Sequence, residues 1–263
     1  MTVYEFAVYE MLPAAVLGFA AGMVYRIVRY LSVYKRTVRP RRRVRSVGHS
    51  LVHLIKTFAY PIYFSIKEEK IMFASGLLGL HILGVIPLLF LFSHHVTWWA
   101  YYFPPYGALK RLAIPPSATS GALTVTAPVT PASGMSGTFV NTIWGPLTVV
   151  LNGDVLAIIA IVATAFKVVE KIPRKVRGKV SYVRIGDFVA LLLLLFILIT
   201  GFMATQHLPS GEIGVYKTVL GLHILGAELL LMLLPFTKFF HFVFGYWYGK
   251  LHEWYDLTWT RGV

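Results

Sequence analysis

Long apolar blocks constrain this chain of 263 residues more than any other feature. Five of them cover approximately residues 4–25, 71–92, 155–169, 188–204 and 219–240. A helix needs about 20 mostly apolar residues to cross a bilayer core, and the third block reaches that length only if it begins nearer Leu147. Charged residues make up 14% of the chain, against roughly 25% in soluble domains. We therefore expect an all-α membrane protein, with residues 1–263 forming one domain around a bundle of five transmembrane helices.

The distribution of Lys and Arg indicates how these helices are oriented. Twelve of the 25 lie between Arg26 and Lys70, seven lie between Lys167 and Arg184, and three lie at or beyond the last block. The two connections on the other side carry only three. Because cytoplasmic loops are enriched in Lys and Arg, we expect an outside N-terminus and a cytoplasmic tail at 242–263, in a multi-pass protein of the plasma membrane. The net charge of +14 then reflects topology and attraction to anionic lipid, and not nucleic-acid binding.

Two connections are long enough to have structure of their own. Residues 46–69 include HSLVHLIKTFAYPIYFSI, which is typical of an amphipathic helix on the cytoplasmic surface. Residues 94–150 begin with aromatic side chains suited to a membrane interface and continue into a region rich in Pro, Thr, Ser and Gly. We expect this second segment to be an outer loop, with room for a short β-ribbon.

The chain has no cysteine. This excludes Cys-ligated iron–sulfur clusters, thiolate-ligated haem and zinc sites built on Cys, so that any metal must be held by the nine histidines, the carboxylates or the methionines. Asn and Gln together number three, and this scarcity of thermolabile residues favours a thermophilic source.

Histidine occurs inside two apolar blocks, within the same hexapeptide GLHILG at residues 79–84 and 221–226. A polar ring in hydrocarbon is costly and usually marks function, although a histidine bonded to a neighbouring helix is the ordinary alternative. In a continuous α-helix, His223 and His241 share one face, about 27 Å apart. His81 and His95 nearly share a face too, about 21 Å apart. Two antiparallel helices with this spacing would ligate two stacked b-type haems through neutral imidazoles, and the motif glycines would let the macrocycles approach the backbone.

The last block also carries a family resemblance. Its sequence LHILGAELLLMLLPFTKFFH resembles the fifth helix of the gamma subunit of respiratory nitrate reductase, a dihaem cytochrome b, in both histidines, in Pro235-Phe236 and in Lys238. The stretch GDFVALLLLLFILITGFMATQH, with Thr200-Gly201, is similar to the fourth helix of that family. The chain also resembles the membrane cytochromes b of heterodisulfide reductase and of sulfite-reductase-associated complexes. The resemblance implies a bundle that holds two haem b groups between histidines and exchanges electrons with a quinol or quinone.

The second block departs from that family, whose members carry two histidines there, ten residues apart. Neither position ten residues from His81 is a histidine. In the register that we prefer, His81 is the cytoplasmic-side ligand opposite His241, and the outer pair is His95 with His223. In the other register His81 lies opposite His223, and the inner haem takes a histidine of the 46–69 segment or is absent. The expected iron ligands are therefore His81, His95, His223 and His241, with His94, His53 and His49 as alternatives for the fourth.

Other polar side chains are weaker candidates. We expect His207 and His252 to be interfacial or solvated, with a quinone site near His207 as an alternative. Haem propionates need cationic or hydroxyl partners, and the candidates are Lys238, Arg26 and Lys217.

The sequence predicts an electron-transfer subunit with no catalytic residue of its own. Bis-histidine haem has no open position for substrate, so its role is electron transfer. The family resemblance implies that electrons pass between a quinone pool and an iron–sulfur partner subunit, which serves a catalytic reductase subunit. The aromatic tail at 242–263 suits docking of such a partner. Two alternatives compete with this interpretation: a haem-free transporter or channel with histidines in a polar pathway, and a structural membrane anchor that has lost one or both haems.

Overall fold

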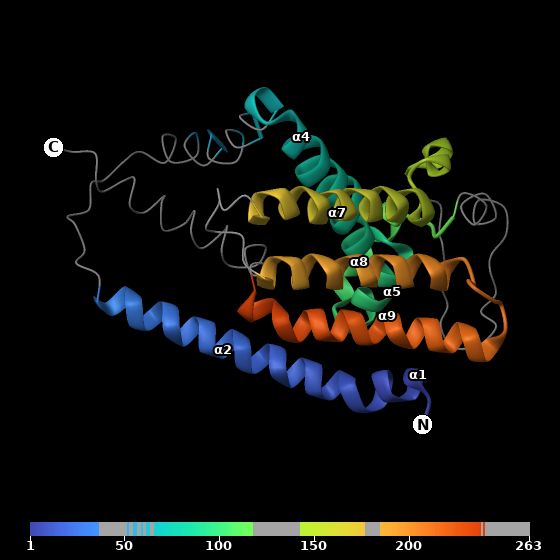
Figure 1. Ribbon diagram of the computed structural model, residues 1–263. Helices are drawn as coiled ribbons and strands as arrows, with labels where there is room; N and C mark the ends of the chain where they lie inside the picture. Colours follow the sequence, from blue (N-terminus) through green and yellow to red (C-terminus); the bar gives the residue numbers. More distant parts are fainter. Residues whose placement is uncertain are drawn as a thin grey trace.

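The structure is a computed structural model that describes residues 1–36, 66–117, 143–176, 185–237 and 239, with isolated residues between 52 and 63. Every regular element in these ranges is helical (Figure 1). The first helix consists of α1 (Val3–Glu5), η1 (Phe6–Met11) and α2 (Leu12–Arg36), and the second of α4 (Lys70–Met72), η2 (Phe73–Val85) and η3 (Pro87–Leu91). The remaining elements are α5 (Ser93–Tyr102), η4 (Pro104–Leu112), η5 (Gly145–Val149), α7 (Gly153–Val176), α8 (Ile185–Thr205), α9 (Ile213–Leu233) and η6 (Leu234–Phe236). The interfacial helix expected at 46–69 and the tail at 242–263 lie almost wholly outside the described residues.

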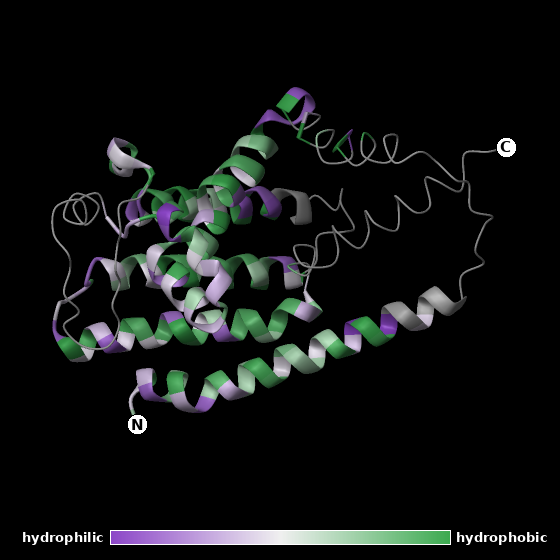
Figure 2. Cartoon of the chain, turned by 180° about the vertical axis from the view of Figure 1, so that it is seen from behind, coloured by the Kyte–Doolittle hydropathy of each residue, from purple (hydrophilic) through white to green (hydrophobic). Residues whose placement is uncertain are grey.

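Four of the described helices are long and apolar enough to cross a bilayer, which makes the chain a multi-pass membrane protein. They are Val3–Arg29, Lys70–Leu91, Ile185–Thr205 and Ile213–Phe236. The fifth expected span, at 155–169, is not among them. Its helix α7 carries Asp154, Lys167 and Glu170, which leave an uninterrupted apolar stretch shorter than a bilayer core needs. Figure 2 shows apolar residues along the middle of the helices and hydrophilic ones toward their ends.

Helices that follow one another along the chain run in alternating directions, whereas the first helix packs against the last one in parallel. A Cβ built on Gly221 of α9 would touch Tyr4 near the start of the first helix, and one built on Gly22 would touch Pro235 just after α9. The starts of the two helices therefore lie together and so do their later parts, which means that the first helix runs parallel to α9. Helix α9 packs antiparallel to α8, and α8 antiparallel to α7, whose first turn receives a 2.6 Å hydrogen bond from Gln206 to Asp154. The second helix in turn packs antiparallel to α7. Tyr4, the start of α7 and the α8–α9 turn therefore meet at one end, which we call the amino end of the bundle.

The glycines of the repeated hexapeptide are packing residues. A Cβ at Gly84 would lie 2.9 Å from the Cβ of Ala160 in α7, and one at Gly79 would lie 3.2 Å from the Cβ of Ala163. In α9, Gly221 lies against the backbone of the first helix and Gly226 against Phe196 of α8. Helices in membranes use small residues in this way because backbones can then approach closely. The expectation that these glycines admit a macrocycle is therefore wrong: the space beside them holds other helices.

We expect Gly84→Ala to destabilise the bundle. The new Cβ would lie 2.8 Å from the carbonyl oxygen of Gly79 as well as 2.9 Å from Ala160, and overpacking of this kind costs about 1–3 kcal/mol. Thermal unfolding in detergent measures the effect. Gly214→Ala is the control, because a Cβ there meets only a Glu212 oxygen at 3.9 Å and Ala is the better helix former. Equal or greater stability of the Gly84 variant would show that this contact does not hold the second helix on α7.

The second helix differs from the regular α-helix that the sequence predicts. Residues Phe73–Val85 and Pro87–Leu91 form i→i+5 bonds and are π-helical. The helix ends at Leu91, Phe92 has ψ 130°, and α5 begins at Ser93 as a separate element. The 3.6-residue period that placed His81 and His95 on one face therefore does not apply between them.

The last span also ends earlier than expected. Helix α9 stops at Leu233, Leu234–Phe236 is a 3₁₀ turn, and Thr237 is extended. Pro235 explains this end, because proline lacks an N–H and its ring clashes with the preceding turn. The side chain of Arg26 donates to the carbonyl oxygen of Pro235 at 2.5 Å. The argument that His223 and His241 share one face needs an unbroken helix to 241, which the structure does not have.

The described parts of the expected outer loop at 94–150 contain helices. The bend at Phe92 folds α5 and η4 back onto the end of the second helix. One isolated parallel bridge joins Phe92 to Ile114, and the Pro/Thr/Ser/Gly-rich stretch expected to have room for a β-ribbon lies almost wholly outside the described residues. The chain then leads into α7 through hydrogen bonds from Gly153 N and Asp154 N to the carbonyl oxygens of Pro115 and Pro116, at 2.8 and 2.9 Å. Residues 118–142 lie outside the described residues.

Candidate functional site

His223 is held by α8 through its Nδ1 atom. Nδ1 lies 2.9 Å from the carbonyl oxygen of Ile197 and 3.5 Å from Oγ1 of Thr200. A carbonyl oxygen only accepts hydrogen bonds, so Nδ1 carries the proton and Nε2 presents its lone pair. The hydroxyl of Thr200 donates to Phe196 O at 2.7 Å. The imidazole is therefore fixed in one tautomer by the backbone of the neighbouring helix.

Gly201 makes this position of the ring possible. A Cβ at residue 201 would lie 2.8 Å from Cε1 and 3.1 Å from Nδ1 of His223. The imidazole thus lies against backbone that only glycine leaves uncovered. The sequence pointed to Thr200-Gly201 only through a family resemblance, and the structure supplies the physical reason for these two residues.

His81 and His95 repeat the same arrangement. Nδ1 of His81 lies 2.7 Å from Gly76 O, five residues earlier in the π-helix. Nδ1 of His95 lies 2.6 Å from Leu88 O at the end of the second helix. Burial lowers the pKa of His95, against the opposing effect of the Leu88 and Leu89 carbonyls, which favours the neutral ring. Metal-bound histidines usually donate their second ring N–H to a backbone carbonyl or carboxylate in this way.

His95 also belongs to a cap on the second helix. The last carbonyls of a helix have no partner within the helix and must bond elsewhere. Here Leu88 O accepts from His95, Leu89 O from Trp99 at 3.4 Å and Phe90 O from Tyr106 at 2.8 Å. Leu91 O accepts from Ile114 N at 2.7 Å. No sequence pattern indicated this cap, because its donors lie 7 to 23 residues further along the chain.

His95 and His223 lie on different helices, α5 and α9. His223 stands beside Gly201, close to the end of α8, and His95 follows the end of the second helix beside the start of α7. The two rings are half-buried. The preferred register pairs these two histidines at the outer haem, and that pairing stays a prediction.

His81 lies deeper in the bundle, on the π-helix between Gly79 and Gly84. Its expected partner His241 lies outside the described residues, as do His53, His49, His252 and Lys238. The inner pair therefore stays a prediction. In the parts of the chain that the structure describes, no three His, Asp or Glu residues form a group able to hold a metal ion.

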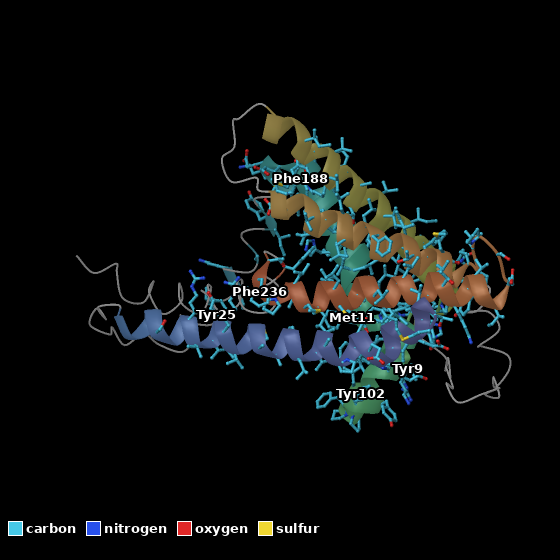
Figure 3. The ribbon with its side chains drawn as sticks, turned by 60° about the horizontal axis from the view of Figure 1, so that its bottom comes forward. Tyr9, Met11, Tyr25, Tyr102, Phe188 and Phe236 are labelled. Atoms are coloured by element: carbon cyan, nitrogen blue, oxygen red, sulfur yellow. The ribbon has the colours of Figure 1, made fainter. Side chains whose placement is uncertain are left out.

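The other residues that the sequence offered, as an alternative ligand, a quinone-site residue or propionate partners, have separate surroundings. His94 is exposed and its ring meets Phe92 edge-on at 5.3 Å. His207 is exposed and stacks on Tyr216 at 4.9 Å, in keeping with an interfacial position. Lys217 lies in the first turns of α9, near the amino end of the bundle. The side chain of Arg26 donates a hydrogen bond to the carbonyl oxygen of Pro235. The rings of the adjacent residues Tyr25 and Phe236 lie side by side (Figure 3).

Comparison with known proteins assigns no family to the chain: no family model matches it, and neither the curated proteins nor the solved structures contain a significant match.

Proposed function

We propose that this chain is the membrane cytochrome b subunit of a respiratory oxidoreductase complex. In this proposal it passes electrons through two b-type haems between a membrane quinol or quinone and an iron–sulfur partner subunit, which serves a catalytic reductase subunit. The observation that carries the proposal is the shared geometry of His81, His95 and His223, because each ring has Nδ1 on a backbone carbonyl. Two imidazoles in this tautomer present Nε2, the atom that binds haem iron in bis-histidine sites.

The residues that would hold the two haems divide between the ends of the bundle. His95 and His223 would hold the outer one, and His81 with His241 the inner one. Bound haem supplies reversible one-electron chemistry at iron. The chain itself supplies ring orientation: the carbonyls of Leu88, Ile197 and Gly76 hold the Nδ1 protons of His95, His223 and His81. Gly201 leaves the space in which the His223 ring lies.

Helix directions support five spans with the N-terminus outside. The first helix, the second helix, α7, α8 and α9 alternate in direction, as five successive crossings require. Helix α7 would cross as the fifth, with Lys167 and Glu170 paired at 2.9 Å near its basic end. Such pairing reduces the cost of charge at membrane depth. Arg26 and Lys167 both lie at the end opposite the amino end, the side on which Lys and Arg are concentrated.

Partner binding follows from the same orientation. A basic side in the cytoplasm would place the tail 242–263 where a soluble iron–sulfur subunit can dock, and the chain has no Cys for clusters of its own. The quinone would react at the outer haem edge, and the protein would reside in the plasma membrane.

We expect the purified full chain to bind two haem b groups, with bis-imidazole absorption spectra. A pyridine haemochrome assay and a protein determination on the same sample measure the ratio. A fully folded, colourless chain would contradict the proposal and favour a transporter or channel if it carries solute flux in liposomes. One haem or none without flux would instead favour a structural anchor.

A further inference from the structure

A short segment at the amino end of the bundle carries apolar side chains that the described part of the chain leaves uncovered. In and around η5, Ile143 is 64% exposed, Leu147 56%, Val149 67% and Val150 54%. Proteins rarely leave a run of apolar side chains this open to water, and such a patch marks a contact with a membrane or another molecule. We call residues 143–150 the amino-end foot.

Hydrogen bonds fix one end of the amino-end foot to η4. The backbone N–H of Ile143 donates to the carbonyl oxygen of Arg111 at 2.9 Å. The indole Nε1 of Trp144 donates to the carbonyl oxygen of Leu112 at 3.0 Å. The exposed side chains therefore belong to a segment with a defined position.

Asn152 fixes the other end to α7. This residue is 2% exposed, and its Nδ2 atom donates to the carbonyl oxygens of Thr148 and Val149, both at 3.0 Å. Its Oδ1 atom accepts from Val155 N at 3.1 Å and so caps α7. The hydroxyl of Thr148 in turn donates to Gly145 O at 2.8 Å.

These bonds leave the amino-end foot with a satisfied interior and an apolar exterior. Its polar groups bond to one another, to η4 and to Asn152, whereas the exposed positions at 143, 147, 149 and 150 carry only hydrocarbon. An element that enters lipid needs this arrangement, because lipid offers its backbone no water to bond. A loop in water has no such requirement.

The amino-end foot projects sideways from the bundle. Figure 1 shows η5, in yellow-green, beside the first turn of α7, displaced across the axes of α7, α8 and α9 and not along them; the opposite view in Figure 2 agrees. Helices α8 and α9 are long and apolar enough to cross the membrane. Lipid surrounds such helices sideways, whereas water lies beyond their ends. The amino-end foot therefore reaches toward the lipid beside α7.

Two cations lie next to the amino-end foot. Lys110 and Arg111 are exposed in the last turn of η4, and the backbone of Arg111 is the one that binds Ile143. Lysine and arginine close to a membrane surface attract the phosphates of anionic lipids. Elements that lie in the membrane interface combine apolar and basic side chains in this way.

We propose that the amino-end foot is a lipid-docking surface. It inserts Leu147, Val149 and Val150 at the boundary between headgroups and acyl chains, and it places Lys110 and Arg111 on phospholipid phosphates. This surface does not depend on the proposed haem function, because its side chains lie on η4 and η5 and not among the histidines.

The test places a fluorescent label on the full chain in vesicles of phosphatidylcholine and phosphatidylglycerol. Because the chain has no cysteine, Leu147→Cys and Val149→Cys each create a single labelling site. Ser210→Cys is the matched control, since Ser210 is exposed in the α8–α9 turn at the same end. We expect lipids with a nitroxide near the headgroup to quench both foot labels several-fold more strongly than the control label, and iodide in the water to quench them less.

The opposite pattern would overturn the docking. If iodide quenches all three labels equally and the nitroxide lipids do not favour the foot labels, the amino-end foot lies in water and is open to a soluble partner instead. Two label positions keep the test valid if one variant fails to fold.

The two cations are tested with the label at residue 149. We expect phosphatidylglycerol to be enriched there over phosphatidylcholine, by about fivefold for each cation, when the nitroxide is carried by one lipid or the other. The double variant Lys110→Gln/Arg111→Gln should lose this enrichment. Lys217→Gln should keep it, because Lys217 is exposed at the same end but lies on α9. Equal quenching by both lipids in the unsubstituted foot, or enrichment that persists in the double variant, would refute the phosphate contacts.

Discussion

Replacing His223 with Ala is expected to remove one of the two haems and leave the other, so that the haem content of the purified chain falls by about half. The reason is the position of the ring, which is fixed by Ile197 and Thr200 on α8 and presents Nε2. An alanine offers no nitrogen to iron, and loss of one of two axial ligands leaves that haem without its bis-histidine site. Haem quantification and redox titration of the remaining centre measure the effect.

A double substitution identifies the partner of His223. If His95 and His223 hold the same haem, then His95→Ala, His223→Ala and the double variant all retain one haem with the same midpoint potential. His94→Ala is the matched control, since His94 is adjacent in sequence but exposed. His241→Ala should remove the opposite haem. Loss of one haem in His223→Ala beside unaltered haem content in His95→Ala would favour the other register, and two haems with unaltered spectra in His223→Ala would refute the ligand assignment.

Substituting Ala for Gly201 is expected to displace the His223 ring and weaken binding of the same haem at least tenfold. The added Cβ would lie 2.8 Å from Cε1 of His223, so either the ring or the α8–α9 contact must move. Changes to groups that orient a metal-bound histidine typically reduce metal affinity 10- to 100-fold. Titration of haem into the apo-chain, followed by absorbance, measures the affinity.

Gly186→Ala is the control for Gly201→Ala on the same helix. A Cβ at Gly186 meets no atom within 4 Å, so this variant changes helix propensity without changing the site. Since Ala favours a helix over Gly by roughly 1 kcal/mol, neither variant should lose helical structure. Equal haem affinity in the two variants would mean that Gly201 does not determine where the His223 imidazole lies.

The two GLHILG copies illustrate how far a local pattern can be interpreted. Both copies place a histidine on a membrane-spanning helix, as their apolar surroundings predict. The glycines beside them were expected to make room for a macrocycle and instead contact α7, α8 and the first helix. A glycine permits close approach of some group, but which group approaches depends on residues far away in the sequence.

Same-face arguments failed for a related reason. They assume that a helix keeps a 3.6-residue period without interruption. The second helix is π-helical and ends before His95, and α9 ends at Leu233, just ahead of Pro235 and well before His241. Pro235 was visible in the sequence as a helix-breaking residue, whereas the π-helix has no local signal that we can identify. His95 reaches its position through the bend at Phe92 and not through a face that it shares with His81.

The sequence by itself determined that the chain is helical and embedded in a membrane, which residues form the apolar helices and which histidines lie among them. It could do so because the cost of placing peptide groups and side chains in hydrocarbon is summed over adjacent residues. Only the tertiary structure decided that α5 folds back so that His95 caps the second helix, that Gly201 makes room for an imidazole, and that the buried Glu228 has no hydrogen-bond partner among the described residues. These outcomes depend on contacts between residues 7 to more than 200 positions apart, and no local period records them.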